Sequence, residues 1–174
     1  MSGAVPQIEL KDMSGYKVAV ISASWHKEIC DALVDGAHRA LAAAKVSIDP
    51  VIHVPGSFEL PLAAQFALDA GADAAVVLGV VVRGETPHFD YVCQGVTDGV
   101  MQVSLSRSKP IGFGVLTVDN VEQAIARSGM TGSKEDKGFD STVAALELLR
   151  LKKSKKEEFL ASAPKREPVS GFFG

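Results

Sequence analysis

An uninterrupted apolar run, Ala74 to Val82, constrains the fold of this chain more than any other feature. It reads Ala-Ala-Val-Val-Leu-Gly-Val-Val-Val, with no polar residue at alternate positions. A run of this kind, rich in β-branched residues, favours a strand that is buried on both of its faces. Such strands occur in parallel sheets that helices cover on both sides, so the run predicts an α/β fold.

Segments of strand and helix character alternate along the rest of the chain. The predicted strands are residues 16–22, 51–54, 74–82 and 111–118, and the predicted helices are residues 27–44, 58–70, 87–107, 119–128 and 139–160. Pro61 is expected in the first turn of its helix, where a proline does not interrupt the hydrogen-bond ladder. Asp119 and Glu122 fit a capping box for the fourth helix, and Gly129 fits its C-terminal cap.

This alternation predicts a single domain over residues 1–160 of the 174-residue chain. The expected architecture is three-layer α/β/α around a central four-stranded parallel sheet, because strands that alternate with helices pair in parallel. Residues 1–15 are expected to form an N-terminal arm, and residues 161–174, which contain two prolines, a flexible C-terminal tail.

The loops that follow the predicted strands are expected to share one edge of the sheet. Right-handed crossovers place all of these loops on the same side, and ligands of open α/β sheets bind there. The loops are residues 23–26, 55–59, 83–88 and 117–120. The first three carry most of the unusual side chains, among them Trp25, Glu59 and His88. The sequence therefore predicts a ligand site where these loops meet.

The third of these loops ends in a helix-start signal. Thr86 and Pro87 predict a helix with Thr86 as the N-cap and Pro87 at the first helical position. His88 would then lie in the first turn, where free backbone amides and the helix dipole favour an anion and a neutral imidazole. Near pH 7 a neutral imidazole can give or take a proton, so His88 is a candidate catalytic residue.

The composition of the chain and the absence of several known motifs argue against some classes of function. The chain is 47% hydrophobic, 22% charged and 6% aromatic, with a formal net charge of −3, which argues against disorder and against nucleic-acid binding. No apolar run approaches bilayer-spanning length and no secretory signal is visible, so we expect a cytoplasmic protein without a membrane partner. Cys30 and Cys93 lack metal-like spacing, and CxxC, HExxH, Walker and GxGxxG patterns do not occur, so no metal or nucleotide cofactor is expected.

Each unusual residue also has a structural interpretation. His88 could cap or hydrogen-bond near a surface turn. Trp25, the only tryptophan, could anchor the core or stack on a planar ligand ring. Glu59 could complement a helix dipole or accept N–H groups of a ligand. Arg127 could stabilise the end of its helix, and Lys137 could be a solvated charge.

Three groups of residues, in matching order and spacing, resemble one enzyme family. They are Pro55-Gly56-Ser57-Phe58-Glu59-Leu60-Pro61, Arg83-Gly84-Glu85-Thr86-Pro87-His88-Phe89-Asp90, and Phe113-Gly114-Val115-Leu116-Thr117 followed by Glu122-Gln123-Ala124-Ile125-Ala126-Arg127-Ser128-Gly129. The chain resembles the 6,7-dimethyl-8-ribityllumazine synthases from about residue 16 to residue 150. The resemblance implies a flavodoxin-like fold and the penultimate reaction of riboflavin synthesis.

That reaction condenses 5-amino-6-(D-ribitylamino)uracil with 3,4-dihydroxy-2-butanone 4-phosphate. An imine forms, phosphate is eliminated, and the ring closes with loss of water. The resemblance implies no cofactor and no metal. It also implies a homopentamer with active sites at subunit interfaces, and an association with riboflavin synthase.

The resemblance assigns roles by position. For the ribitylaminouracil it implies Trp25, Ser57, Phe58, Glu59, Val80, Val81, Val82 and Phe113, and for the butanone phosphate Glu85, Thr86, Arg127 and Lys137. His88 is implied as the proton-transfer residue, and Arg127 is expected to join it from the same chain. Phe113 is expected from the neighbouring subunit. The Glu85 carboxylate would weaken phosphate binding if it pointed inward, and could point away if only its backbone N–H makes the contact.

Two other functions fit the same pattern. The chain could bind a flavin or lumazine without catalysis, or it could be a shell-forming scaffold. The segment from Met130 to Lys137 is slightly longer than the corresponding turn in shell-forming members of the family, which favours a free pentamer over a shell.

Overall fold

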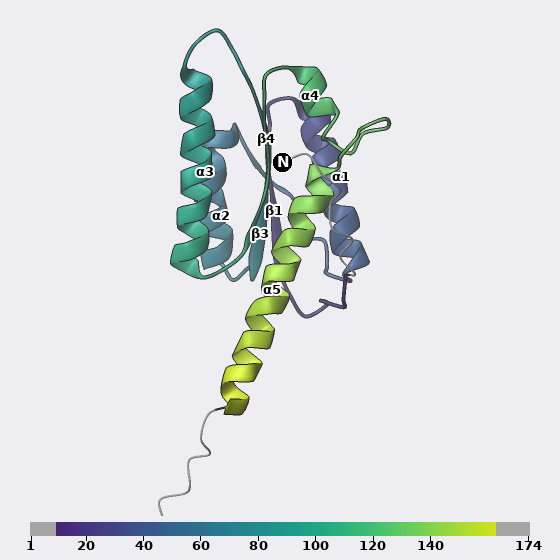
Figure 1. The fold of residues 1–174 in the computed structure, drawn as a ribbon, viewed down its shortest axis with the longest axis vertical. Coiled ribbons are helices and arrows are strands. Elements are labelled where there is room, and N and C mark those ends of the chain that lie inside the picture. Colours follow the sequence, from purple (N-terminus) through teal and green to yellow (C-terminus); the bar gives the residue numbers. More distant parts are fainter. Residues whose placement is uncertain (1–9, 163–174) are drawn as a thin grey trace, which may run out of the picture.

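The computed structural model describes residues 10–162 and contains one four-stranded, all-parallel sheet (Figure 1). Its strands are β1 (Val18–Ala23), β2 (Ile52–Val54), β3 (Ala74–Val82) and β4 (Ile111–Val118), in the spatial order β2-β1-β3-β4. β3 pairs with β1 on one side and with β4 on the other. The apolar run thus forms an inner strand, as its composition predicts.

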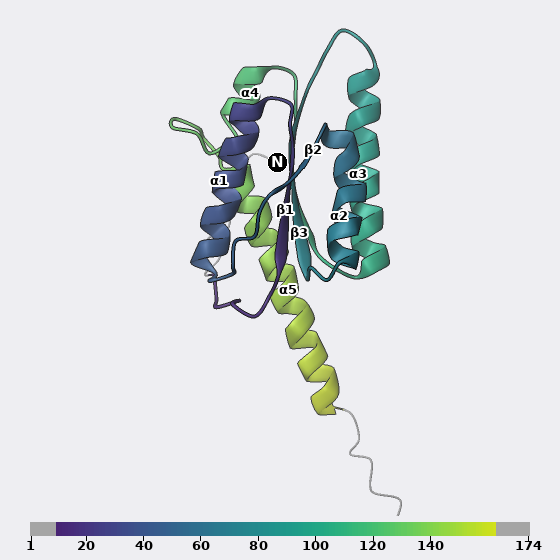
Figure 2. The ribbon, with the colours of Figure 1, turned by 180° about the vertical axis from the view of Figure 1, so that it is seen from behind.

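Helices cover both faces of the sheet (Figures 1 and 2). One face carries α1 (Lys27–Ala43) and α5 (Lys137–Ser162), and the other carries α2 (Leu60–Asp69) and α3 (His88–Arg107). A 3-10 turn, η1 (Ser57–Glu59), precedes α2, and the short α4 (Val121–Ile125) follows β4. The predicted three-layer α/β/α fold is confirmed.

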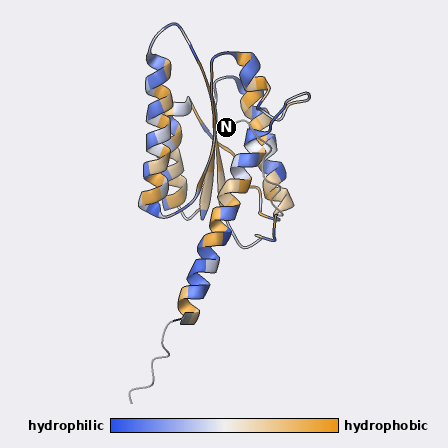
Figure 3. Ribbon diagram, in the orientation of Figure 1, coloured by the Kyte–Doolittle hydropathy of each residue, from blue (hydrophilic) through white to orange (hydrophobic). Residues whose placement is uncertain are grey.

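The core consists of two apolar clusters, one on each side of the sheet. Alternate residues of β3 divide between them: Val76 and Leu78 belong to the α1/α5 side, and Ala75 and Val77 to the α2/α3 side. In Figure 3 the strands lie in the centre and the helices on both sides of them carry both hydrophilic and hydrophobic residues. Met13, which precedes β1, is also buried in the α1/α5 cluster, although it lies in the segment predicted as an arm.

The start of α3 differs from the prediction. Pro87 rather than Thr86 is the N-cap, its backbone is already helical, and no side chain caps this end. The helix begins at His88 and runs to Arg107. Pro87 takes the cap position because its ring fixes φ near the helical value and leaves no donor to satisfy.

The predicted cap of α4 is also wrong, by one residue. Asn120 is the N-cap, and its side chain accepts a hydrogen bond from the Gln123 backbone at 2.9 Å. The Gln123 side chain accepts from the Asp119 backbone N–H at 3.0 Å, so Asn120 and Gln123 take the places predicted for Asp119 and Glu122. The helix ends at Ile125, so Gly129 lies beyond its C-terminal cap, Ala126.

The last helix is longer at its start than predicted. It begins at Lys137, because the Asp136 carboxylate accepts from the Phe139 backbone N–H at 3.0 Å and satisfies a free amide of the first turn. Lys137 therefore lies on the helix and not in the preceding loop. The helix continues to Ser162, and most of the predicted tail, residues 163–174, lies outside the described residues.

Candidate active site

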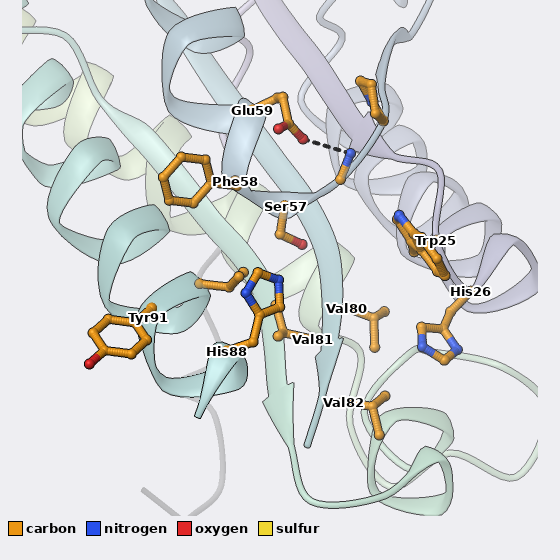
Figure 4. A pocket seen from close by; sticks show the side chains of 13 residues that line it. Trp25, His26, Ser57, Phe58, Glu59, Val80, Val81, Val82, His88 and Tyr91 are labelled. Carbon is orange, nitrogen blue, oxygen red and sulfur yellow. Dashed lines mark hydrogen bonds between the residues drawn. The ribbon is translucent and has the colours of Figure 1, made fainter. Parts of the chain in front are cut away.

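A hollow of about 730 Å³ opens at the edge of the sheet where β1, β2 and β3 end (Figure 4). Its lining comes from two of the loops that the sequence places together, from the end of β3 and from the first residues of α3. The lining residues are Trp25, His26, Pro55, Gly56, Ser57, Phe58, Glu59, Val80, Val81, Val82, His88, Tyr91 and Val92. Eight residues that the resemblance assigns to substrates or to proton transfer are among them: Trp25, Ser57, Phe58, Glu59, Val80, Val81, Val82 and His88.

Trp25 presents its ring to this hollow. Its side chain is 70% exposed, so it is not a core anchor. The backbone around it is fixed, because the Cys30 thiol donates to the Trp25 carbonyl at 3.1 Å and His26 adopts a left-handed conformation (φ 54°) at the start of α1. Gly56 lies beside the indole ring, and an added Cβ there would be 3.6 Å from its Cδ1 atom. An exposed ring held at this edge can stack on a planar ligand.

Ser57 lies deeper in the wall of the hollow. It is buried, and its hydroxyl has no hydrogen-bond partner among the described residues. The close approach to β3 depends on Gly79, because a Cβ at that position would be 2.6 Å from the Ser57 hydroxyl oxygen. A buried hydroxyl without a partner is costly, which makes this oxygen a candidate for contact with a ligand.

Glu59 is held by its own turn. One carboxylate oxygen accepts from the Gly56 backbone N–H at 2.9 Å, and the residue lies at the start of α2. This position agrees with the structural interpretation of the residue, because a carboxylate near a helix start is favourable. The same contact fixes the carboxylate at the rim of the hollow (Figure 4).

His88 reaches the hollow from the first residue of α3, as Figure 4 shows. Its side chain is exposed, and it makes no hydrogen bond to another residue between positions 10 and 162. Glu85 and Thr86 lie in the exposed loop just before it and do not line the hollow. The ring is thus accessible to a substrate and is not occupied by a structural hydrogen bond.

A second hollow, of about 370 Å³, lies along β4, the outermost strand on that side of the sheet. It is lined by Phe113, Gly114, Val115, Leu116, Thr117, Val118, Arg127, Glu135 and Lys137. Phe113 and Thr117 are exposed, whereas Val115, which lies between them on the same face of the strand, is buried.

Two cations and one carboxylate meet in the second hollow. The Arg127 guanidinium donates to the Gln123 carbonyl at 2.9 Å, which satisfies a free carbonyl at the end of α4. The Lys137 ammonium pairs with Glu135 and, at 3.3 Å, with Asp140. The hydrogen bond to Glu135 raises the pKa of Lys137, and the same bond lowers the pKa of Glu135, with a smaller contribution from Arg127. The charge of the hollow therefore suits an anion that displaces Glu135.

The structure separates two residues that were expected in one site. Arg127 lies in the second hollow with Phe113, and His88 lies in the first. The expectation that Arg127 completes the His88 site within one chain is therefore not met. The short α4 turns Arg127 toward the open edge of β4, a direction that local sequence signals do not encode.

Two further properties of residues 10–162 concern membranes and metal ions. No helix in this range is long and apolar enough to cross a membrane. The same residues contain no group of three or more His, Cys, Asp or Glu side chains that could hold a metal ion.

Comparisons with known proteins decide the family. The sequence model described as 6,7-dimethyl-8-ribityllumazine synthase matches residues 15–153. A protein named 6,7-dimethyl-8-ribityllumazine synthase from Kineococcus radiotolerans is 55% identical over 148 residues, which cover 84% of this chain and 91% of the relative. Proteins of the same name from Streptomyces coelicolor (51% identity; 84% and 91% coverage) and Clavibacter michiganensis (54%; 82% and 89%) are similarly close.

The chain belongs to the 6,7-dimethyl-8-ribityllumazine synthase family.

Both hollows lie inside the part of the chain that matches the lumazine synthase family, so the resemblance noted from the sequence is confirmed. Membership in this family supports a catalytic role in riboflavin biosynthesis and does not favour the non-catalytic alternatives.

Sequence reasoning missed several residues of the two hollows. His26 and Tyr91 line the first, and Glu135 lines the second. Tyr91 lies almost one turn after His88, and that helical spacing could have indicated it. In the sequence, Glu135 is one of several charged residues that follow one another. Nothing in that pattern indicates that Glu135 rather than a neighbour pairs with Lys137.

Proposed function

We propose that this protein condenses 5-amino-6-(D-ribitylamino)uracil with 3,4-dihydroxy-2-butanone 4-phosphate to form 6,7-dimethyl-8-ribityllumazine. The observation that carries the proposal is the pair of hollows, one lined by an exposed ring and a free histidine, the other by two cations. The reaction is inferred from membership in the lumazine synthase family. The side chains that line the two hollows suit the two substrates of that reaction. The reaction proceeds without a metal or a cofactor.

The ribitylaminouracil occupies the first hollow. Trp25 stacks on the pyrimidine ring, since its indole is exposed and its backbone is fixed. Ser57, Phe58 and Glu59 and the end of β3, Val80 to Val82, hold the ring edge and the ribityl chain. The partnerless Ser57 hydroxyl and the anchored Glu59 carboxylate support these roles, because each offers an oxygen to ligand N–H or O–H groups.

The phosphate of the second substrate lies between Arg127, Lys137 and the loop of Glu85 and Thr86. Arg127 has guanidinium N–H groups beyond the one used by Gln123, and Lys137 is already in contact with carboxylates that a phosphate can replace. Backbone N–H groups of the Glu85 loop supply neutral donors, with the Glu85 carboxylate turned outward.

His88 transfers protons between these two binding regions. The uracil amine attacks the ketone, and loss of water from the carbinolamine gives the imine. Elimination then removes a proton from carbon and releases phosphate, and ring closure loses a second water. A neutral histidine with no structural hydrogen bond can both accept and return these protons. Holding both substrates together supplies further acceleration.

One complete site takes its two hollows from neighbouring copies of the chain. Trp25, Ser57 to Glu59 and His88 come from one copy, and Phe113, Arg127 and Lys137 from the next. Exposed apolar side chains on the outer helices support self-association: Leu62 and Phe66 on α2, and Met101 and Leu105 on α3.

The assembly is a free homopentamer, without the larger shell. We further propose that residues 1–160 form a single domain, that the enzyme acts in the cytoplasm, and that it associates with riboflavin synthase, which would use its product.

The test is to mix both substrates with the protein and follow the absorbance and fluorescence of the lumazine. We expect product and an equal amount of inorganic phosphate. A non-catalytic binder would bind the pyrimidine without turnover, and a scaffold would be indifferent to changes at His88. No product at saturating concentrations of both substrates would overturn the proposed function.

A further inference from the structure

The guanidinium of Arg83 connects three elements at the ligand edge. Arg83 directly follows β3, and its backbone N–H donates to the Val118 carbonyl of β4 at 2.9 Å. Its side-chain Nε donates to Asp119, just beyond β4, at 3.0 Å, and its Nη1 donates to Asp90 in the first turn of α3 at 3.3 Å. The carbon of the guanidinium also lies 4.1 Å from the centre of the Phe89 ring.

These contacts surround the place where His88 enters the hollow. Phe89 and Asp90 are the two residues that directly follow His88. The connection before it, residues 84–87, is exposed, and the start of α3 has no side-chain cap. In the described structure, Arg83 is the residue whose side chain ties this uncapped turn to the end of β4. A side chain that must transfer protons needs such support from its neighbours.

We propose that Arg83 is a positioning residue that fixes the first turn of α3 and thereby the ring of His88. This proposal rests on the proposed proton-transfer role of His88. Arg83 does not line either hollow, so it acts through the helix start and not on a substrate. All three charged side chains are about half exposed or more, and pairs this exposed add little to stability. The main effect of the network is therefore on geometry.

The planar guanidinium is essential to this arrangement. It donates in two directions in its plane while its face rests on the Phe89 ring. A lysine keeps the charge but cannot combine these contacts. Small displacements of a catalytic group can reduce turnover about a hundredfold.

The test compares kcat, both KM values and the melting temperature of Arg83→Lys and Arg83→Gln with those of the unchanged protein. We expect kcat to fall about tenfold or more in both variants, with KM values within about twofold and little change in melting temperature. Arg107→Lys is the matched control, since Arg107 makes two similar bonds to Asp69 at the far end of α3. It should leave kcat unchanged. A normal kcat for Arg83→Lys would overturn the proposal.

A double variant distinguishes positioning of His88 from general damage. In a His88→Ala background, Arg83→Gln should reduce kcat little further, because the ring that it positions is absent. If Arg83→Gln lowered kcat by the same factor in the unchanged protein and in the His88→Ala variant, the positioning role of Arg83 would be overturned. The proton-transfer role of His88 would not be affected by that result. Full turnover by His88→Ala itself would instead overturn the proton-transfer role, and the role of Arg83 with it.

Discussion

At the scale of single residues, the two hollows contain different chemical groups, with His88 in the first and Arg127 in the second. His88 is an exposed histidine without a structural hydrogen bond, and Arg127 is a partly buried cation that caps a short helix. Neither is part of the apolar core, so each can be replaced without creating a core cavity. The kinetic effects of the two changes should differ, because we propose that His88 moves protons and that Arg127 holds an anion.

We predict that His88→Ala lowers kcat by about a hundredfold or more, the usual contribution of general acid–base catalysis. The KM values should change little, and the circular dichroism spectrum should match that of the unchanged protein. Steady-state lumazine formation measures the effect. Unchanged kcat in a folded variant would contradict the assignment.

For Arg127→Ala we predict a rise of about tenfold or more in the KM for the butanone phosphate, the effect of losing a charge-assisted hydrogen bond. The KM for the ribitylaminouracil should stay near its original value. Arg150→Ala is a suitable control, because Arg150 pairs with Glu147 on the exposed side of α5. Equal changes in both KM values would argue against a phosphate role.

At the scale of helices and strands, the hydrophobic pattern predicts the four strands and their parallel arrangement correctly. The fourth strand and the long third strand match residue for residue, since continuous apolar runs have few alternatives in a covered sheet. The helix starts were less predictable. At α4, Asp119 and Asn120 are both good N-caps, and only the surrounding backbone selects the second.

The way in which α1 and α5 pack against each other could not be predicted from the sequence either. This packing determines that Lys137, at the start of α5, lies in the second hollow. At Gly138, an added Cβ would be within 2.0 Å of the Leu33 carbonyl oxygen, a backbone atom that cannot turn aside. We predict that Gly138→Ala lowers the free energy of unfolding by about 1–3 kcal/mol, the usual cost of overpacking. Urea unfolding provides the measurement. Gly15→Ala, which meets nothing within 4 Å, is the control, and equal stability of the two variants would contradict the packing.

At the scale of the whole molecule, the chain has two separate hollows, and we propose that neither is a complete site by itself. The sequence predicts which loops meet around His88, because topology alone brings them to one edge. It does not reveal that Arg127 lies with Phe113 in a separate hollow, because that depends on the tertiary placement of α4. The proposed division of the site residues between copies could be inferred only after both hollows were located.

We predict that light scattering gives a mass five times that of one chain. The exposed apolar side chains of α2 and α3, such as Phe66 with 62% exposure, favour association. Phe66→Asp should lower the mass and the activity together. A monomer that retains full activity would contradict a shared site, and a much larger particle would contradict the free pentamer.

The most direct test of the shared site is to produce His88→Ala and Arg127→Ala chains together in one cell. Each variant alone is expected to be impaired, but a mixed assembly should contain some interfaces at which an intact His88 faces an intact Arg127. In a random mixture about a quarter of the sites should be intact. We predict lumazine formation well above that of either variant alone. Activity no higher than the mean of the two variants would show that each site is built within one chain.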